Sequence, residues 1–255
     1  MDIHDNLKNL DIKVYKSITS TNTVLKEMAA SGAPEGTVLI AETQTEGRGR
    51  MGRNFYSPSD TGIYLSILLR PTIPAKDSLF LTTAAAVAVA KSIETIKDCN
   101  ADIKWVNDIY IDNKKVCGIL TEGSINTQNG GLDYAVVGIG INVCPPEEGF
   151  PSQLENIAGS IFTREEISTD KKRLLIEELL SLFIHYYKAM PDRIFFEEYK
   201  KRSFLLGKKI YVIRNDKHIP AKAMDIDDEC HLIVKYDNGA TESLSSGEVS
   251  IKLNQ

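Results

Sequence analysis

The first part of the chain alternates short apolar runs with segments in which apolar residues recur at helical spacing. Ser20, Thr21 and Asn22 have side chains that suit a helix N-cap, and Gly32 suits the position just after a helix end. An apolar run bounded by turn residues is typical of a strand. The pattern therefore predicts strands at residues 12–15, 37–43 and 62–70, and helices at residues 23–30 and 75–96.

The middle of the chain carries strand candidates joined by tight turns. Short strands at residues 103–105 and 109–111 precede a turn at 112–115, an apolar run at 116–125, a turn at 129–131 and a second run at 133–143. Strands that follow one another through tight turns pair antiparallel. Because these strands cluster between helices and do not alternate with them, the pattern favours an α+β fold over a doubly wound parallel sheet.

The last third of the chain changes character at Gly207. Before it, apolar residues recur at helical spacing through residues 170–190, and a second amphipathic segment covers residues 193–206. After it come short strand candidates separated by turn residues at 215–216, 227–228 and 237–239, a pattern typical of a small β-barrel. We therefore predict two domains, residues 1–206 and 207–255.

The composition disfavours several classes of protein. Hydrophobic residues make up 42% of the 255 and charged residues 25%, which is ordinary for a globular protein, and a net charge of −5 disfavours nucleic acid as the main partner. The four cysteines form no C-x-x-C pair, so they predict neither a zinc site nor a disulfide framework and fit a reducing cytoplasm. The first residues lack the features of a signal peptide, and polar residues interrupt the apolar stretch at 79–96, which predicts a core helix.

One segment, Gly47-Arg48-Gly49-Arg50-Met51-Gly52-Arg53, is here called the arginine loop. A guanidinium presents its donors in a rigid fork, and glycines let backbone N–H groups approach a ligand, so the expected ligand is a phosphate or a carboxylate. The glycine spacing matches the dinucleotide-binding fingerprint, but arginines occupy the intervening positions and no clear helix follows. Taken alone, the segment is equally consistent with a solvated surface loop.

Two lysine-bearing segments add candidate chemistry. Lys104, Asn107 and Asp108 lie within five residues, and the carboxylate suits Mg²⁺ beside a triphosphate; alternatively, the Asn-Asp pair makes a turn. Lys115 enters an apolar strand candidate, where it would act as a point charge on a carboxylate or phosphate if it pointed inward. The neighbouring Lys114 competes for that role, and spacing does not choose between them.

The strand candidate Gly138-Ile139-Gly140-Ile141-Asn142 has glycines that would let a flat ligand or another strand approach closely. Asn142 could then read the edge of an adenine, although a bulge with a structural asparagine is the better explanation of this segment taken alone. The four histidines form no evident metal or acid–base set.

Taken together and in this order, the motifs resemble those of the biotin–protein ligases, also called biotin–[acetyl-CoA-carboxylase] ligases. The resemblance covers nearly the whole chain. It rests on Ser20-Thr21-Asn22, Gln44 to Arg53, Lys104-Trp105-x-Asn107-Asp108, Lys115-Val116-Cys117-Gly118-Ile119-Leu120, Gly138-x-Gly140-Ile141-Asn142 and Ser246-Gly247-Glu248-Val249-Ser250.

The resemblance implies a seven-stranded mixed β-sheet backed by helices, of the class II aminoacyl-tRNA synthetase and biotinyl–lipoyl ligase type, followed by an SH3-like barrel. It also implies a ligase that forms an amide (carbon–nitrogen) bond in two steps. ATP and biotin, with Mg²⁺, give biotinyl-5′-AMP and pyrophosphate, and a lysine of a biotin carboxyl carrier protein then takes the biotinyl group. That carrier belongs to acetyl-CoA carboxylase or another biotin-dependent enzyme.

The resemblance also assigns roles to individual residues. The implied catalytic residues are Lys115, Arg50 and Asp108, and Asp108 is also the candidate metal ligand. The implied biotin-binding residues are Ser20, Thr21, Asn22, Gln44, Arg48, Gly49, Arg50, Lys115 and Gly118. The implied ATP- and adenylate-binding residues are Arg48, Arg50, Arg53, Phe55, Lys104, Asn107, Asp108 and Asn142.

The sequence departs from the family pattern at two positions. Val106 stands where the family usually has proline, and Phe55 stands where it usually has tryptophan, so an adenine would stack on a smaller ring. Some relatives carry an N-terminal winged-helix DNA-binding domain; the few residues before the first strand candidate are too short for one, so we expect no DNA partner. We expect no membrane partner either, and leave a homodimer open. The alternatives are a lipoate–protein ligase and a non-catalytic adenylate- or RNA-binding module.

Overall fold

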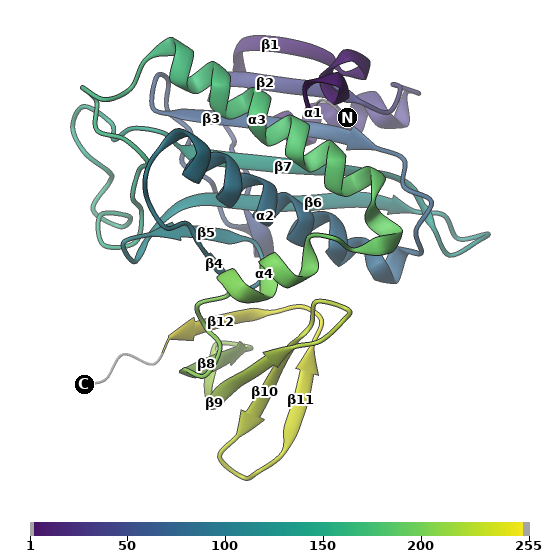
Figure 1. Cartoon of the computed structure of the whole chain (residues 1–255), viewed down its shortest axis with the longest axis vertical. Helices are drawn as coiled ribbons and strands as arrows, with labels where there is room; N and C mark the ends of the chain where they lie inside the picture. Colours follow the sequence, from purple (N-terminus) through teal and green to yellow (C-terminus); the bar gives the residue numbers. More distant parts are fainter. Residues whose placement is uncertain (1–2, 252–255) are drawn as a thin grey trace.

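The computed structural model describes residues 3–251, so the outer ends of the two predicted domains, residues 1–2 and 252–255, lie outside the described residues. The chain forms a seven-stranded sheet with helices on both faces, and a five-stranded sheet near the C-terminus (Figure 1). The larger sheet lies entirely before Gly207 and the smaller one entirely after it. The domain boundary at residues 206 and 207 stays a prediction.

The larger sheet is mixed, as the resemblance implies. Its strands, from one edge to the other, are β1 (Asp11–Ile18), β2 (Thr37–Gln44), β3 (Gly62–Leu69), β7 (Leu132–Asn142), β6 (Lys114–Ile125), β5 (Asp108–Ile111) and β4 (Asp102–Lys104). β1 and β2 pair parallel and every other neighbouring pair is antiparallel. The α+β fold class is therefore confirmed.

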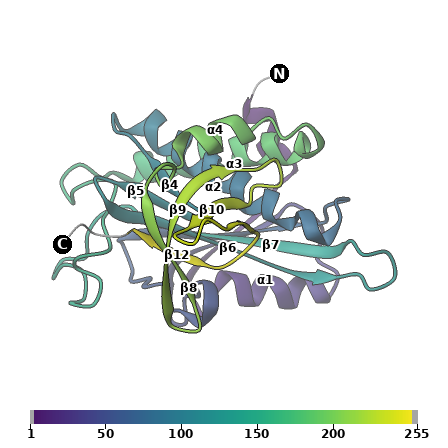
Figure 2. The same cartoon turned by 90° about the horizontal axis from the view of Figure 1, so that it is seen from below.

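Helices cover both faces of this sheet, which explains why β3 is apolar along almost its whole length and does not alternate. Seven of the eight β3 residues are buried. Helix α1 (Thr21–Ala30) packs Leu25 and Ala29 against Leu39, Leu68 and Val136 on one face. Helices α2 (Leu79–Ile96) and α3 (Thr169–Lys188) lie on the opposite face (Figure 2).

Helix α2 is the central core helix. A 3-10 turn, η3 (Ala75–Ser78), precedes it, so the predicted helix at residues 75–96 is one 3-10 turn followed by an α-helix. Among the described residues, Ala75–Ile96 is the one helical stretch long and apolar enough to cross a membrane by length and composition, but 72% of its most apolar window is buried inside the protein. The prediction of a core helix is confirmed.

Helix α4 (Phe196–Arg202) is shorter than the predicted amphipathic segment at residues 193–206. Arg193 has a φ of +48°, which breaks the helix on the N-terminal side. After Arg202 the chain turns to the edge of the large sheet, where Ser203 bridges to Ile103 and the Phe204 N–H donates to Ile103 O at 3.2 Å. The prediction was wrong here because the free edge of β4 offers these backbone groups an alternative to helical hydrogen bonds.

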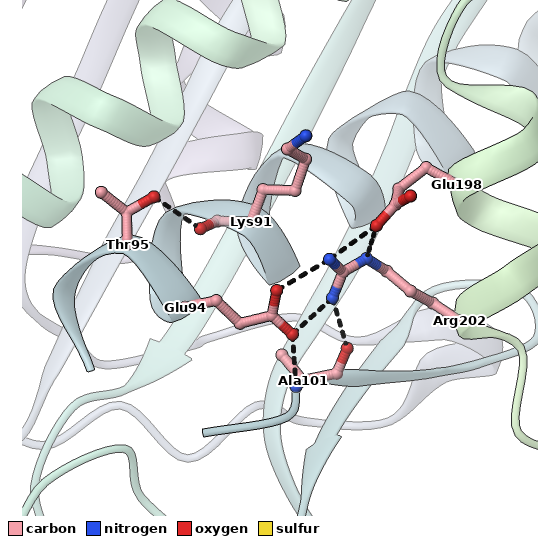
Figure 3. Close-up of polar contacts among 6 residues, drawn as sticks. All are labelled: Lys91, Glu94, Thr95, Ala101, Glu198 and Arg202. Carbon is pink, nitrogen blue, oxygen red and sulfur yellow. Dashed lines mark hydrogen bonds and ion pairs between the residues drawn. The ribbon is translucent and has the colours of Figure 1, made fainter. Parts of the chain in front are cut away.

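Arg202 joins α4 to the end of α2 and the start of β4 (Figure 3). Its guanidinium donates to both carboxylate oxygens of Glu94, at 2.6 and 2.7 Å, to Glu198 Oε1 at 2.7 Å and to Ala101 O at 3.1 Å. Glu94 in turn accepts the Ala101 N–H at 2.9 Å. This partly buried bidentate pair fixes the edge of the sheet beside the segment that carries Lys104 and Asp108.

The smaller sheet is antiparallel, with strand order β11-β10-β9-β8-β12. The strands are β8 (Lys209–Arg214), β9 (Lys217–Ile226), β10 (Leu232–Tyr236), β11 (Thr241–Leu244) and β12 (Glu248–Ile251). Asn215 and Asp216 both have positive φ, as a two-residue hairpin turn requires, and Gly239 has a φ of +86°. The predicted turns and the SH3-like domain are confirmed.

Candidate active site

An open cavity with about 970 Å³ of empty space, its mouth included, lies at the ends of β2, β4 and β5 and is also lined by β6, β7 and the arginine loop. Gly247, Glu248 and Val249 of the smaller domain also line it. Every site residue implied by the resemblance lines this cavity except Asn142: Ser20, Thr21, Asn22, Gln44, Arg48, Gly49, Arg50, Arg53, Phe55, Lys104, Asn107, Asp108, Lys115 and Gly118.

One end of the cavity is built from uncharged polar groups at the start of α1. The helix begins at Thr21, two residues earlier than predicted, and Ser20 is its N-cap residue but makes no side-chain cap hydrogen bond. Gln44 Oε1 lies 2.8 Å from Thr21 N and 3.1 Å from Thr21 Oγ1, and Gln44 Nε2 donates to Ser57 Oγ at 3.0 Å. Gln44 thus satisfies the first backbone N–H of the helix in place of the N-cap side chain, while the buried Ser20, Thr21 and Asn22 line the cavity.

A carboxylate that the sequence analysis did not single out stands beside this end. Glu122 of β6 accepts hydrogen bonds from Lys26 Nζ at 2.7 Å and Asn22 Nδ2 at 3.0 Å, and forms an ion pair with Arg48 at 3.2 Å. Burial opposes its ionisation, but the hydrogen bonds from Lys26 and Asn22 outweigh burial, and the pKa of Glu122 lies below its usual value. Glu122 thus connects the arginine loop to Asn22.

The arginine loop is folded back on itself over the cavity. Gly49 N donates to Arg53 O at 2.7 Å, and Phe55 N donates to Gly47 O at 2.8 Å. A Cβ at Gly47 would lie 2.3 Å from Phe55 O, so only glycine fits this position. Arg50 donates to Asn107 Oδ1 at 2.9 Å and to Gly247 O at 3.4 Å, which links the loop to both domains.

The other end of the cavity is strongly cationic. Arg50, Arg53, Lys104 and Lys115 line it, against two carboxylates, Asp108 and Glu248, while Arg48 is paired with Glu122 beside the uncharged end. Those carboxylates are already paired, Asp108 with Lys115 at 2.6 Å and Glu248 with Arg53 at 2.5 Å. Burial lowers the pKa of Arg50 and of Lys104, because the protonated form is harder to hold away from water. The remaining positive charge suits an anionic ligand.

The structure distinguishes the two neighbouring lysines. Lys115 lines the cavity, whereas Lys114 Nζ donates to Glu155 O at 2.9 Å, outside it. Of the two lysines, Lys115 is therefore the one that faces the cavity.

The glycines of β6 and β7 make room for side chains of the protein itself. A Cβ at Gly140 would lie 2.6 Å from the Phe55 ring, and one at Gly118 would lie 3.3 Å from it, so the ring rests against both glycines. A Cβ at Gly138 would lie 2.0 Å from Asn22 Oδ1. Asn142 does not line the cavity; its Nδ2 donates to Gly159 O at 3.0 Å.

Two comparisons identify the family. Residues 14–142 match the model of the biotin/lipoate A/B protein ligase family, and residues 205–252 match that of the biotin protein ligase C terminal domain. The chain is 35% identical over 234 residues to the bifunctional ligase/repressor BirA of Bacillus spizizenii, covering 90% of this chain and 70% of that protein. The chain belongs to the biotin/lipoate A/B protein ligase family.

Other members of the family agree in sequence and in fold. The biotin--[acetyl-CoA-carboxylase] ligase of Mycobacterium tuberculosis is 31% identical over 247 residues, covering 93% of this chain and 88% of that protein. The structure of the biotin protein ligase from Aquifex aeolicus in complex with biotin and ATP superposes with a TM-score of 0.75 at 27% identity, covering 95% of this chain and 98% of that one. The resemblance stated from the motifs is thereby confirmed.

One carboxylate of this ligase fits the Mg²⁺ that the family resemblance implies. Asp108 Oδ1 is buried and ion-paired with Lys115, yet it accepts no hydrogen bond of normal geometry, so it has lone-pair capacity left for a cation. Mg²⁺ is commonly held by one or two carboxylates together with substrate phosphates. Among the described residues, the one cluster of three possible ligands is Asp227, Glu229 and His231, where Asp227 already accepts two backbone N–H groups of its own turn.

Sequence reasoning missed the residues that hold the site from behind and from the other domain. Ser66 is a single polar residue in an otherwise apolar strand, and that isolation was the available signal, whereas Glu122 has the polar neighbours Thr121 and Ser124 and carried no such signal. Gly247 and Glu248 belong to a motif that carried the resemblance, but nothing in the sequence places that motif beside the arginine loop.

Proposed function

We propose that this ligase activates biotin with ATP to give biotinyl-5′-AMP and pyrophosphate, and then transfers the biotinyl group to a lysine of a biotin carboxyl carrier protein. The observation that carries the proposal is the polarity of one continuous cavity, with uncharged hydrogen-bonding groups at one end and the cationic side chains of Arg50, Arg53, Lys104 and Lys115 at the other. Biotin has an uncharged ureido ring and a carboxylate tail, and its activation adds an α-phosphate to that tail. The uncharged ring of the ligand therefore matches the uncharged end of the cavity, and its anionic tail matches the cationic end.

In this assignment Ser20, Thr21, Asn22 and Gln44 surround the ureido ring, and Gly118 and Gly49 line the path of the acyl chain. Arg48, Arg50 and Lys115 bind the carboxylate and the α-phosphate, where negative charge develops as the carboxylate oxygen attacks. Fixed cations aimed at developing charge in a partly dehydrated site lower the barrier, because they need no reorganisation during the reaction. The arginine loop covers the acyl-adenylate and limits its hydrolysis.

The nucleotide occupies the cationic end in this assignment. The Phe55 ring offers a face to adenine, and Lys104, Asn107 and Arg53 lie close enough to the cavity to meet the phosphates and ribose. Asp108 would hold Mg²⁺ together with ATP oxygens, and the ion would neutralise phosphate charge. Asn142 keeps its proposed contact with adenine only if adenine extends beyond the cavity toward the end of β7.

In the second step the lysine of the carrier protein must be neutral to attack the acyl carbon, so a nearby carboxylate helps to receive its proton. We assign this role to Asp108. Its Oδ1 already forms an ion pair with the ammonium group of Lys115 at 2.6 Å, inside the same cavity. The carrier would belong to acetyl-CoA carboxylase or another biotin-dependent enzyme. We place the reaction in the cytoplasm, and we leave a homodimer open.

The decisive experiment is ATP–pyrophosphate exchange with each candidate acid. We expect exchange with biotin and none with lipoate, because a dithiolane ring has no polar group to pair with Thr21 and Gln44, and unpaired buried polar groups strongly disfavour a wrong ligand. Exchange with lipoate but not with biotin would contradict the assignment. Salt-sensitive retention on RNA without any biotin-dependent turnover would favour the binding-module alternative.

A further inference from the structure

The arginine loop is held at its tip and at its base by different partners. The tip is held through Arg50 and Arg53, which contact residues 247 and 248 of the smaller domain. At the base, an antiparallel backbone bridge joins Arg48 to Asn54. The Arg48 side chain reaches from this base to the large sheet, where it forms an ion pair with a carboxylate of β6 at 3.2 Å. The base of the loop is therefore tied to the large sheet independently of the smaller domain.

The carboxylate is that of Glu122, and the alternation of side chains along β6 explains its position. Gly118, Leu120 and Glu122 are alternate residues of this strand, so they share one face of the sheet. Gly118 and Leu120 line the cavity, but Glu122 does not. It lies one step further along the strand, where α1 supplies its other partners, Asn22 and Lys26. Glu122 is therefore beside the ligand site and not in it.

Glu122 holds three donors at once. Its Oε1 lies 2.7 Å from Lys26 Nζ and 3.2 Å from Arg48 Nη1, and its Oε2 accepts a hydrogen bond from Asn22 Nδ2 at 3.0 Å. The Glu122 side chain is 18% exposed, so these contacts are screened less than those of a fully exposed ion pair. Arg48 uses one nitrogen atom in the ion pair, and the other N–H groups of its guanidinium stay available to an anion. Glu122 therefore fixes the direction of the Arg48 guanidinium and leaves it able to bind a ligand.

We infer that Glu122 is a positioning residue of this ligase, which holds Arg48 and the base of the arginine loop at the edge of the cavity. The inference rests on the proposed function and adds a residue that acts on the acyl-adenylate through Arg48. Without the charge of Glu122, the Arg48 side chain, which is already 44% exposed, becomes hydrated and the loop loses the contact at its base. The adenylate that the loop covers is then released more easily.

The test uses Glu122→Gln, which removes the charge but keeps the shape and an acceptor oxygen for Asn22. Arg48→Met removes the other partner of the ion pair, and the double variant completes a double-mutant cycle. Lys26→Met removes the second cation of the cluster, which lies on α1 and not on the loop. Glu27→Gln is the matched control, because Glu27 is an exposed carboxylate of α1 and its loss changes the net charge by the same amount.

We expect bound biotinyl-adenylate to be released about three- to tenfold faster from Glu122→Gln than from the wild-type ligase. In an Arg48→Met background the same substitution should change release by no more than about twofold, whereas in a Lys26→Met background it should keep its effect. Glu27→Gln should match wild type. Unchanged release from Glu122→Gln would overturn the inference. So would effects of Glu122→Gln and Arg48→Met that simply multiply, since a merely structural Glu122 would show no coupling to Arg48.

A second readout does not depend on activity. Trypsin cleaves after Arg50 and Arg53, and loss of the base contact should make this cleavage about threefold or more faster in the unliganded Glu122→Gln and Arg48→Met variants. If Glu122→Gln does not fold, Arg48→Met decides, because an unchanged cleavage rate would show that this ion pair does not hold the loop. Absence of exchange with biotin in the wild-type ligase would instead contradict the proposed function, so the two failures are distinguishable.

Discussion

At the scale of single residues, the site is a concentration of positive charge that folding alone would not favour. Lys104 and Arg50 are partly dehydrated, and burial lowers the pKa of each. Holding such cations together costs stability, and an anionic ligand relieves that cost. The residues that make the cavity reactive are thus expected to weaken the unliganded protein.

Replacing Lys104 tests this cost. The pKa of Lys104 in the folded protein lies below the usual 10.5, so the protonated side chain lowers the free energy of unfolding, and this cost is fully present at neutral pH. The cost decreases as the pH rises through the folded pKa and is gone above 10.5. Lys104→Met should therefore be more stable than wild type at pH 7, should lose that advantage as the pH approaches 10.5, and should be impaired in exchange. Urea unfolding across this pH range measures the difference.

Lys16→Met, on the exposed edge strand β1, is the matched control and should change stability by no more than about 0.5 kcal/mol at any pH. A Lys104→Met variant that is less stable than wild type at pH 7 would show that the attraction of Lys104 to the nearby charge of Asp108 outweighs the cost of its burial.

At the scale of elements, the arginine loop and the glycine-bearing strands act as a lid and a floor. The loop is held by Arg50 to Asn107 and Gly247, and by Arg53 to Glu248. The floor is formed where the Phe55 ring rests on Gly118 and Gly140. Glycine is needed in these strands because a ring, and not a neighbouring strand, occupies the space of the missing side chain.

Arg50→Ala should loosen the lid more than the fold. The variant loses a charged group that faces the adenylate and the hydrogen bonds to Asn107 and Gly247, so we expect bound biotinyl-adenylate to be released at least about tenfold faster. Burial of the Arg50 guanidinium costs free energy that offsets part of what its hydrogen bonds contribute, so the free energy of unfolding should change little. Release is measured by trapping radiolabelled adenylate; unchanged release would count against the role of the loop.

Gly140→Ala should disturb the floor. The added methyl would lie 2.6 Å from the Phe55 ring, so the ring must shift, at a cost of about 1–3 kcal/mol, and the KM for ATP should rise. In a Phe55→Ala background the same substitution meets no ring and should cost less. A double-mutant cycle in denaturant unfolding measures the coupling; purely additive costs would contradict the contact.

At the scale of the whole molecule, the smaller domain supports the site from two directions. Its segment at Gly247 and Glu248 holds the arginine loop, and Cys230 O accepts the Trp105 Nε1–H at 2.9 Å next to the segment that carries Asp108. On the other side Tyr199 of α4 donates to Val106 O at 3.1 Å. The Lys-Trp-x-Asn-Asp segment is therefore fixed by contacts with both domains.

Trp105→Phe should weaken this junction. It removes the indole donor and leaves Cys230 O without that buried partner, so we expect a loss of about 1–3 kcal/mol in the free energy of unfolding and a reduced rate of exchange. Denaturant unfolding should show one transition in both proteins, shifted to lower denaturant in the variant. A variant of unchanged stability would mean that the two domains are held together elsewhere.

The sequence predicted most elements of the fold because their signals are local. The turn at Asp112 and Asn113, both with positive φ, and the alanine-rich helix α2 follow from neighbouring residues alone. The errors arose where distant groups compete for the same backbone. Residues 203–206 carry a helical pattern, but the open edge of β4 takes up Ser203 and Phe204.

The sequence by itself determined the order of elements, the arginine loop and the motifs that mark the family, since each depends on residues close together in the chain. Only the tertiary structure decided that Lys115 and not Lys114 enters the cavity, that Glu248 reaches Arg53, and that Ser66 and Glu122 meet Asn22. These partners lie 44 to 195 positions apart. Which of them touch depends on how sheets and helices pack, and local periodicity carries no information about that.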